Sequence, residues 1–250
     1  MSKQPRESLL FGHSVRSMLA ESVLIIASIL FAFGIDAWWN ERQDRLEERE
    51  VLLTLQNEFM RFVETINDRF EIHRDQVAAL EQLALSSQVG EWSGTAEAFD
   101  VSISHMMSPT TLDLGSGVVE ALVGVGRIEI IVNRELRRKL AAWGGVLDEV
   151  LDDEVDNSAM VFDQINPYLA GKGVPVSASF RTWGEQAWRI PSRSAGANVE
   201  LVNELLADPE FQTLVEQRLG YKYHLDEELD AAIEAANAIL REIEASLRSF

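Results

Sequence analysis

The chain has 250 residues, is 46% hydrophobic, contains no cysteine and carries a formal net charge of −19 at pH 7. This acidity argues against nucleic acid as a partner, because phosphates would be repelled, and against a domain lying flat on anionic lipid. The lack of cysteine excludes disulfides, thiolate catalysis and cysteine-based zinc or iron–sulfur sites.

A short tail, residues 1–17, precedes the most apolar segment of the chain. That segment is residues 18–39, MLAESVLIIASILFAFGIDAWW, and its length and composition predict a single transmembrane helix. At a rise of 1.5 Å per residue it reaches about 33 Å, enough for a hydrocarbon core of about 30 Å. Trp38 and Trp39 lie where an interfacial aromatic anchor is expected. The lipid bilayer is therefore the first predicted partner.

Basic residues flank the span on both sides, so the positive-inside count nearly ties. They are Lys3, Arg6 and Arg16 before the span, and Arg42, Arg45 and Arg49 after it. A short basic tail before a first span usually stays in the cytoplasm. We therefore predict a bacterial inner-membrane protein with a cytoplasmic N-terminus and a periplasmic C-terminal domain.

Two other interpretations of the apolar segment stay open. One is a cleaved signal peptide that uses Val23–Phe33 as its apolar region and Ala32-Phe33-Gly34 as its cleavage site. The other is a buried core helix of a soluble protein. We favour the span, because the helical pattern continues unbroken past Gly34 and 18 or more apolar residues are typical of a transmembrane helix.

One face of the predicted span carries small and ionisable residues. Glu21, Ser28, Ala32 and Asp36 fall within an arc of about 80° when successive residues are spaced by 100°. Such a face is typical of helix association in lipid, where backbones approach closely and polar groups find partners. It predicts contact with a second copy of the chain or with another membrane protein. Alternatively, Glu21 and Asp36 only extend outward at the two edges of the bilayer.

Residues 40–250 predict an acidic, all-α domain. Apolar residues recur every three or four positions from Leu52 to Ala84, and neither glycine nor proline interrupts Trp39 to Val89. The span is therefore expected to continue into a long stalk helix that ends near Ser87.

Further helices are predicted from caps and from apolar periodicity. Asn133 can cap a helix over 134–165, which should bend or break at Gly144-Gly145, and Asp208-Pro209 starts the last helix, which runs almost to the C-terminus. Shorter helices are expected over 96–107 and 197–206. Residues 118–132 could form a helix and turn or a β-hairpin; we favour the helix and turn, because an isolated hairpin is barely stable. These helices predict an antiparallel bundle on a stalk, with an irregular segment near 166–193.

Three parts of the chain carry a resemblance to a known family. They are Glu21 with the exit from the span Asp36–Arg42 (DAWWNER), the central run Glu120–Glu129 with Glu135–Arg138 and Trp143, and the helix start Asp208–Phe211 (DPEF). On these residues the chain resembles a family of uncharacterised bacterial single-span membrane proteins, a domain of unknown function. The resemblance implies membrane anchoring and no particular chemistry.

The residues that most often carry chemistry show no recognisable motif. The histidines His13, His73, His105 and His224 are scattered without an HExxH pattern, and His73 lies on an apolar stripe, as a core histidine does. An acidic face of one helix is expected to be solvated rather than to bind a cation; it comprises Asp148, Glu149, Asp152, Asp153 and Asp156. We therefore predict no catalytic residue, no metal ligand and no cofactor.

One basic cluster stands out in the acidic domain. It consists of Arg127, Arg134, Arg137 and Arg138, and Gly124-Val125-Gly126 before it reads as a tight turn. The cluster could contact an anion or the acidic face of a partner. We favour the alternative that these residues balance the neighbouring acids.

The sequence supports three functional hypotheses. The leading one is a non-enzymatic, single-pass membrane protein that works by helix–helix assembly as a scaffold, accessory subunit or sensor. The second is a single-span subunit of an ion-driven membrane complex in which Asp36 or Glu21 titrates. The third is a membrane-bound hydrolase or lyase that uses the 166–193 region and Arg127.

Overall fold

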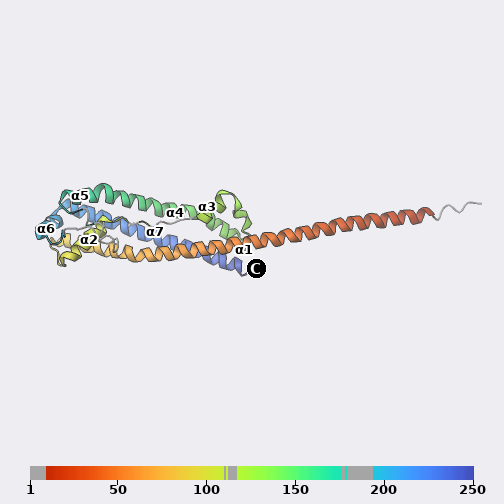
Figure 1. The fold of residues 1–250 in the computed structure, drawn as a ribbon, viewed down its shortest axis with the longest axis horizontal. Coiled ribbons are helices and arrows are strands. Elements are labelled where there is room, and N and C mark those ends of the chain that lie inside the picture. The colour runs from red at the N-terminus through yellow and green to blue at the C-terminus, as the bar shows by residue number, and fades with distance from the viewer. Residues whose placement is uncertain (1–9, 110, 112–116, 176–177, 179–193) are drawn as a thin grey trace, which may run out of the picture. The chain divides into compact units, whose positions relative to one another are not determined.

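The computed structural model describes residues 10–109, 111, 117–175, 178 and 194–250, with the backbone alone for residues 10–17. All regular structure in these ranges is helical, which confirms the all-α prediction (Figure 1). The chain divides into two compact units, Met1–Val51 with Phe250, and Leu52–Ser249. Most of the predicted basic tail and of the irregular segment near 166–193 lies outside the described residues.

The first helix, α1, runs from Leu10 to Val89. It begins before the expected start of the span and ends two residues after Ser87. Gly90 ends it with a left-handed φ of +75°, and the Gly90 N–H donates to the Ser86 carbonyl at 2.8 Å. This is a common way to close a helix, because glycine adopts that backbone conformation without strain.

The part of α1 in the first unit contains the apolar segment, and its side chains are uncovered. Every large apolar side chain from Met18 to Trp39 is between 50% and 72% exposed. Among the described residues, this is the one helix long and apolar enough to cross a membrane. Within this chain the segment is thus not a buried core helix.

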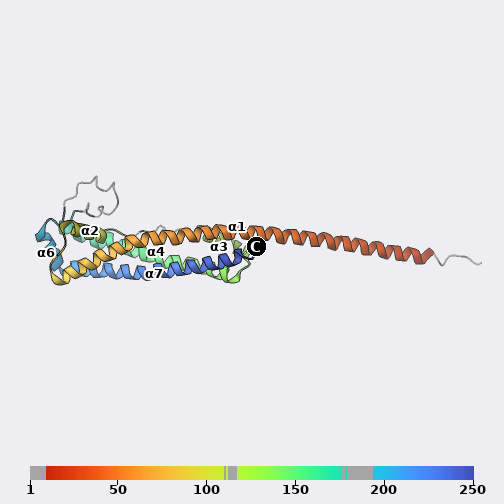
Figure 2. The same cartoon turned by 90° about the horizontal axis from the view of Figure 1, so that it is seen from below.

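The second unit is built on three long helices: the C-terminal part of α1, α4 (Arg134–Ala159) and α7 (Pro209–Leu247). Contacts between α1 and α7 run from Gln212 with Ser87 to Asp226 with His73, so these helices are antiparallel. Contacts between α4 and α7 run from Asn133 with Glu242 to Asp153 with His224, so these two helices are antiparallel as well (Figures 1 and 2). The predicted antiparallel bundle is confirmed.

Local hydrogen bonds explain where the two later helices begin. Asn133 Oδ1 accepts from the N–H groups of Glu135 and Leu136 at 3.0 and 3.1 Å, and Asp208 Oδ1 accepts from Glu210 at 2.9 Å. Both side chains satisfy donors that the first helical turn leaves without partners. The two predicted starts are therefore confirmed.

Of the predicted bend or break at Gly144-Gly145, the break is wrong, because α4 runs through both glycines without interruption. The bend stays a prediction. The irregularity lies instead in η2 (Met160–Ile165), a π-helical segment that joins α4 to α5 (Asn166–Gly171). Glycine lowers the stability of a helix, but the packing of the remainder of α4 keeps this segment helical.

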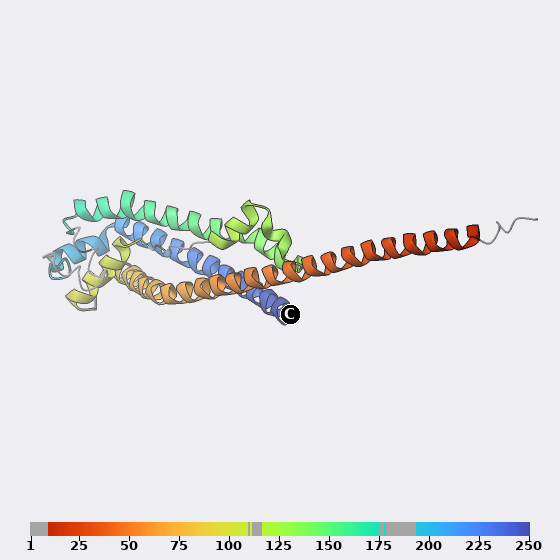
Figure 3. The same ribbon diagram turned by 45° about the vertical axis from the view of Figure 1, so that its right-hand side comes forward.

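Short helices connect the long ones (Figure 3). They are α2 (Ala96–Met107), α3 (Gly117–Gly124), the 3₁₀ helix η1 (Arg127–Ile130) and α6 (Val199–Ala207). Gly126, with φ of +71°, makes the turn between α3 and η1. The helix-and-turn interpretation of 118–132 is confirmed, and the described residues contain no strand.

The core of the second unit is largely apolar. At one end of α4, Trp143 packs edge-on against Phe59 and Phe62 of α1, with ring centroids 5.0 and 4.7 Å apart. At the other end, α2, η2, α6 and the start of α7 enclose a cluster that includes Phe99 and Phe211, both fully buried. The middle of the bundle also buries four polar or charged side chains: His73, Gln76, Arg218 and Lys222.

Candidate functional site

The most unusual feature of the bundle is a pair of buried basic side chains. Arg218 and Lys222 are both 0% exposed. They are one helical turn apart on α7, between the core residues Leu214 and Leu225, so the periodicity of α7 directs them inward. Arginine and lysine are almost never fully buried unless they are paired, so their surroundings need an explanation.

The Arg218 guanidinium reaches the end of α2. Its Nη2 donates to the Ser108 carbonyl at 2.7 Å, while Nε and Nη1 have no hydrogen-bond partner. Burial lowers the pKa of Arg218 to about 9, so the group stays protonated at neutral pH. The bundle therefore holds an incompletely satisfied positive charge in its interior.

Lys222 connects α7 to α1. Its Nζ donates to Oε1 of Gln76, and its backbone carbonyl lies 3.1 Å from Nε2 of His73. Burial, together with the charge of Arg218, holds the pKa of Lys222 well below its usual value. The two contacts of Lys222 join α7 to α1, and the contact of Arg218 joins α7 to the end of α2. The cluster therefore connects all three helices.

His73 completes the cluster and is fully buried, as its place on an apolar stripe suggests. Its Nε2 is close to two acceptors, the Lys222 carbonyl at 3.1 Å and Asp226 Oδ1 at 3.0 Å, and one proton cannot fully serve both. Burial, and then the charge of Lys222, lower the pKa of His73 to about 4. The imidazole is therefore neutral at pH 7, and its contact with Asp226 is not an ion pair.

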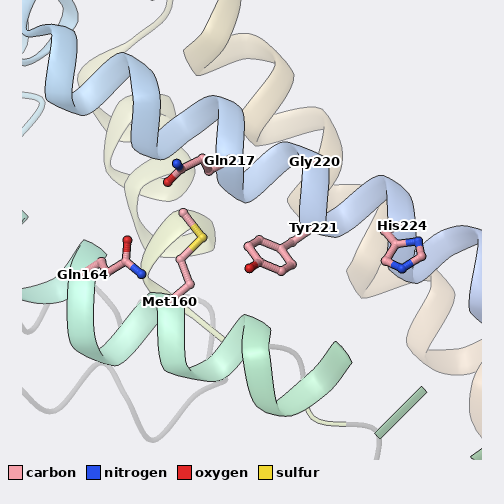
Figure 4. Close-up of a pocket in the computed structure, with 6 residues that line it drawn as sticks. All are labelled: Met160, Gln164, Gln217, Gly220, Tyr221 and His224. Carbon is pink, nitrogen blue, oxygen red and sulfur yellow. The ribbon is translucent and has the colours of Figure 1, made fainter. Parts of the chain in front are cut away.

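A groove lies between η2 and α7. It forms a cleft of about 470 Å³ in which Gln217 and Tyr221 of α7 face Met160 and Gln164 of η2 (Figure 4). His224 closes one end and also borders a second cleft of about 510 Å³ between α4 and α7. The two clefts thus meet at one imidazole.

Three possible metal ligands converge at that imidazole. His224 Nε2 lies 3.6 Å from Asp153 Oδ2 on α4 and 3.6 Å from Glu228 Oε1 on α7. In the sequence, Asp153 belongs to a predicted solvated face and His224 stands apart from it, because the two residues come from different helices. The spacing of His224 and Glu228 by one turn was the only local signal.

The basic cluster lies at the junction of η1 and α4. Arg137 contacts Glu129 at 3.3 Å and donates to the Ile131 carbonyl at 3.0 Å, and Arg138 pairs with Glu135 at 2.6 Å. Arg127 begins η1 and Arg134 begins α4. The Arg137 and Arg138 guanidinium groups thus each pair with a nearby acid. Whether the cluster also contacts an anion or a partner stays a prediction.

The residues predicted for membrane helix association all lie on exposed helix: Glu21, Ser28, Ala32 and Asp36. The Ser28 hydroxyl donates to the Leu24 carbonyl at 2.8 Å within the same helix. The Ser28 hydroxyl therefore has a hydrogen-bond acceptor within its own helix and does not need one from a partner. The predicted interfacial anchors Trp38 and Trp39 are 59% and 55% exposed.

No protein-family model, curated protein or solved structure matches this chain. The resemblance carried by the exit from the span stays a prediction.

Proposed function

We propose that this protein is a single-span membrane protein whose acidic helical domain works by assembly, as a scaffold, accessory subunit or sensor. The observation that carries the proposal is the uncovered apolar surface from Met18 to Trp39. Exposing so many large apolar side chains to water would be costly, at about 25 cal/mol per Å². Lipid, or other helices in lipid, removes that cost.

We place the N-terminus in the cytoplasm and the helical domain in the periplasm of a bacterial cell. The support is the short basic tail before the span, with Lys3, Arg6 and Arg16. The remaining chain is strongly acidic, which suits a domain that stands away from anionic headgroups.

The face with Glu21, Ser28, Ala32 and Asp36 is the proposed contact surface in the membrane. Ala32 and Ser28 allow close approach of a second backbone, and a carboxyl group near each membrane edge gains from a polar partner. We propose that a second copy of the chain, or another membrane protein, covers this face.

Cysteine crosslinking tests the proposal, because the chain has no native cysteine. Ser28→Cys places one thiol on the proposed face, and Ala27→Cys places one on the far side as the matched control. After oxidation of intact membranes, we expect a crosslinked dimer from Ser28→Cys but not from Ala27→Cys. A chain that gives no dimer from either variant, and that purifies from mild detergent as a monomer without a partner, would contradict assembly.

A further inference from the structure

Asp153, His224 and Glu228 bring one nitrogen and two carboxylate oxygens together between α4 and α7. Their donor atoms all lie within 4.8 Å of one another. His224 is exposed, while the Asp153 and Glu228 side chains are 18% and 17% exposed. The group therefore sits at the rim of the bundle, with its imidazole open to the clefts on both sides.

The contacts within this group are not ordinary hydrogen bonds. Both nitrogen–oxygen distances are 3.6 Å, longer than the 2.7–3.2 Å of a hydrogen bond. Four-coordinate zinc with bonds of about 2.1 Å separates neighbouring ligand atoms by about 3.4 Å. The two distances from His224 Nε2 are close to this separation, so they suit a shared ion better than they suit direct pairing.

The carboxylates also lack the partners that buried acids usually have. Asp153 Oδ2 and Glu228 Oε2 are buried atoms with no hydrogen-bond partner, and neither side chain pairs with a lysine or arginine among the described residues. Burial raises the pKa of both groups, and for Asp153 the nearby acids Asp152 and Asp156 add to this. A cation at this point would supply the missing positive charge.

We propose that Asp153, His224 and Glu228 bind a divalent transition-metal ion, with zinc the best match, and that the ion bridges α4 and α7. Imidazole with carboxylate ligands suits Zn²⁺, whereas Ca²⁺ and Mg²⁺ prefer sites made of oxygen alone. Three protein ligands leave a fourth position for water. This proposal does not depend on the membrane assembly proposed above.

Zinc titration of the chelator-treated full-length chain in detergent tests the site, with excess Mg²⁺ present to saturate general acidic surface. We expect one zinc ion per chain with the highest affinity, measured by calorimetry. His224→Gln and Asp153→Asn each remove one ligand, and we expect each to weaken that binding at least tenfold. Far-UV circular dichroism checks that each variant stays helical.

Asp156→Asn is the matched control, because it removes the same charge one turn further along the exposed face of α4. It should change the zinc affinity less than twofold. Binding to the native chain that is no tighter than to His224→Gln would overturn the proposal. So would equal losses in Asp153→Asn and Asp156→Asn, since this result would mean that zinc only associates with the acidic face as a whole.

Discussion

Arg218 is a charged residue in a place that an apolar side chain of similar length could fill. It is fully buried, and only one of its three nitrogens makes a hydrogen bond. Replacing incompletely paired buried ions with well-packed apolar residues is often neutral or stabilising, by about 1–4 kcal/mol. We therefore expect Arg218 to lower the stability of the bundle relative to an apolar residue, while it supplies a defined polar contact with the end of α2.

Arg218→Met should leave the free energy of unfolding unchanged or raise it by about 1–3 kcal/mol, because methionine keeps most of the volume and removes the buried charge. Arg218→Ala should lower it by about 2–4 kcal/mol through the cavity that remains. Urea unfolding followed by circular dichroism measures both variants. Equal destabilisation by methionine and alanine would mean that the guanidinium itself stabilises the fold.

His73 should make the bundle sensitive to acid. Its folded-state pKa of about 4 lies below the ordinary 6.5, so on acidification the unfolded chain takes up this proton first. The contribution of His73 to stability is fully present above pH 6.5 and is lost as the pH falls towards 4, by on the order of 3 kcal/mol in total.

His73→Gln keeps a hydrogen-bond donor but cannot take up a proton. Between pH 7 and pH 4.5, we expect the free energy of unfolding of this variant to fall less steeply than that of the native chain. The difference between the two profiles isolates His73 from the carboxyl groups, which titrate in both chains. Parallel profiles would show that His73 is not the acid-sensitive group.

At the scale of the elements, α7 tolerates a glycine in its interior. A Cβ atom added at Gly220 would meet nothing within 4 Å, and the residue lines the cleft opposite η2. Gly220→Ala should therefore raise the free energy of unfolding by about 0.5–1 kcal/mol, from helix propensity alone. Thermal unfolding measures the change, and a destabilised variant would show that helix propensity does not decide the effect at this position.

Gly126→Ala is the contrasting control. Space is free there too, but φ is +71°, a conformation that alanine adopts only with strain. This variant should lose stability where Gly220→Ala gains it.

Features that depend on nearby residues could be predicted from the sequence, and features that depend on a second helix could not. Asn133 and Asp208 cap helices within three residues of themselves, so their roles are visible in the chain. The periodicity of α7 places Arg218 on the core face, but its charge suggests solvent, and only the packing of α1 and α2 resolves the conflict. Asp153 and His224 meet only because α4 and α7 are antiparallel neighbours.

At the scale of the whole molecule, charge and apolar surface separate along the sequence. Residues 1–39 contain three basic and three acidic residues, so the net charge of −19 lies entirely in residues 40–250. The uncovered apolar surface, by contrast, lies in residues 18–39. Residues 18–39 are therefore expected to bind the membrane, and residues 40–250 are expected to remain in water without them.

Residues 40–250 expressed alone should remain in the supernatant when a detergent-free lysate is centrifuged at high speed, because they lack the span and their acidity opposes binding to anionic lipid. The full chain should pellet with membranes and resist extraction by alkaline carbonate. A chain that lacks only residues 1–17 is the matched control, and it should still pellet. If residues 40–250 also pelleted while retaining helical circular dichroism, the helical domain would carry a membrane contact of its own, and its acidic surface would have to act through cations or through a basic membrane partner.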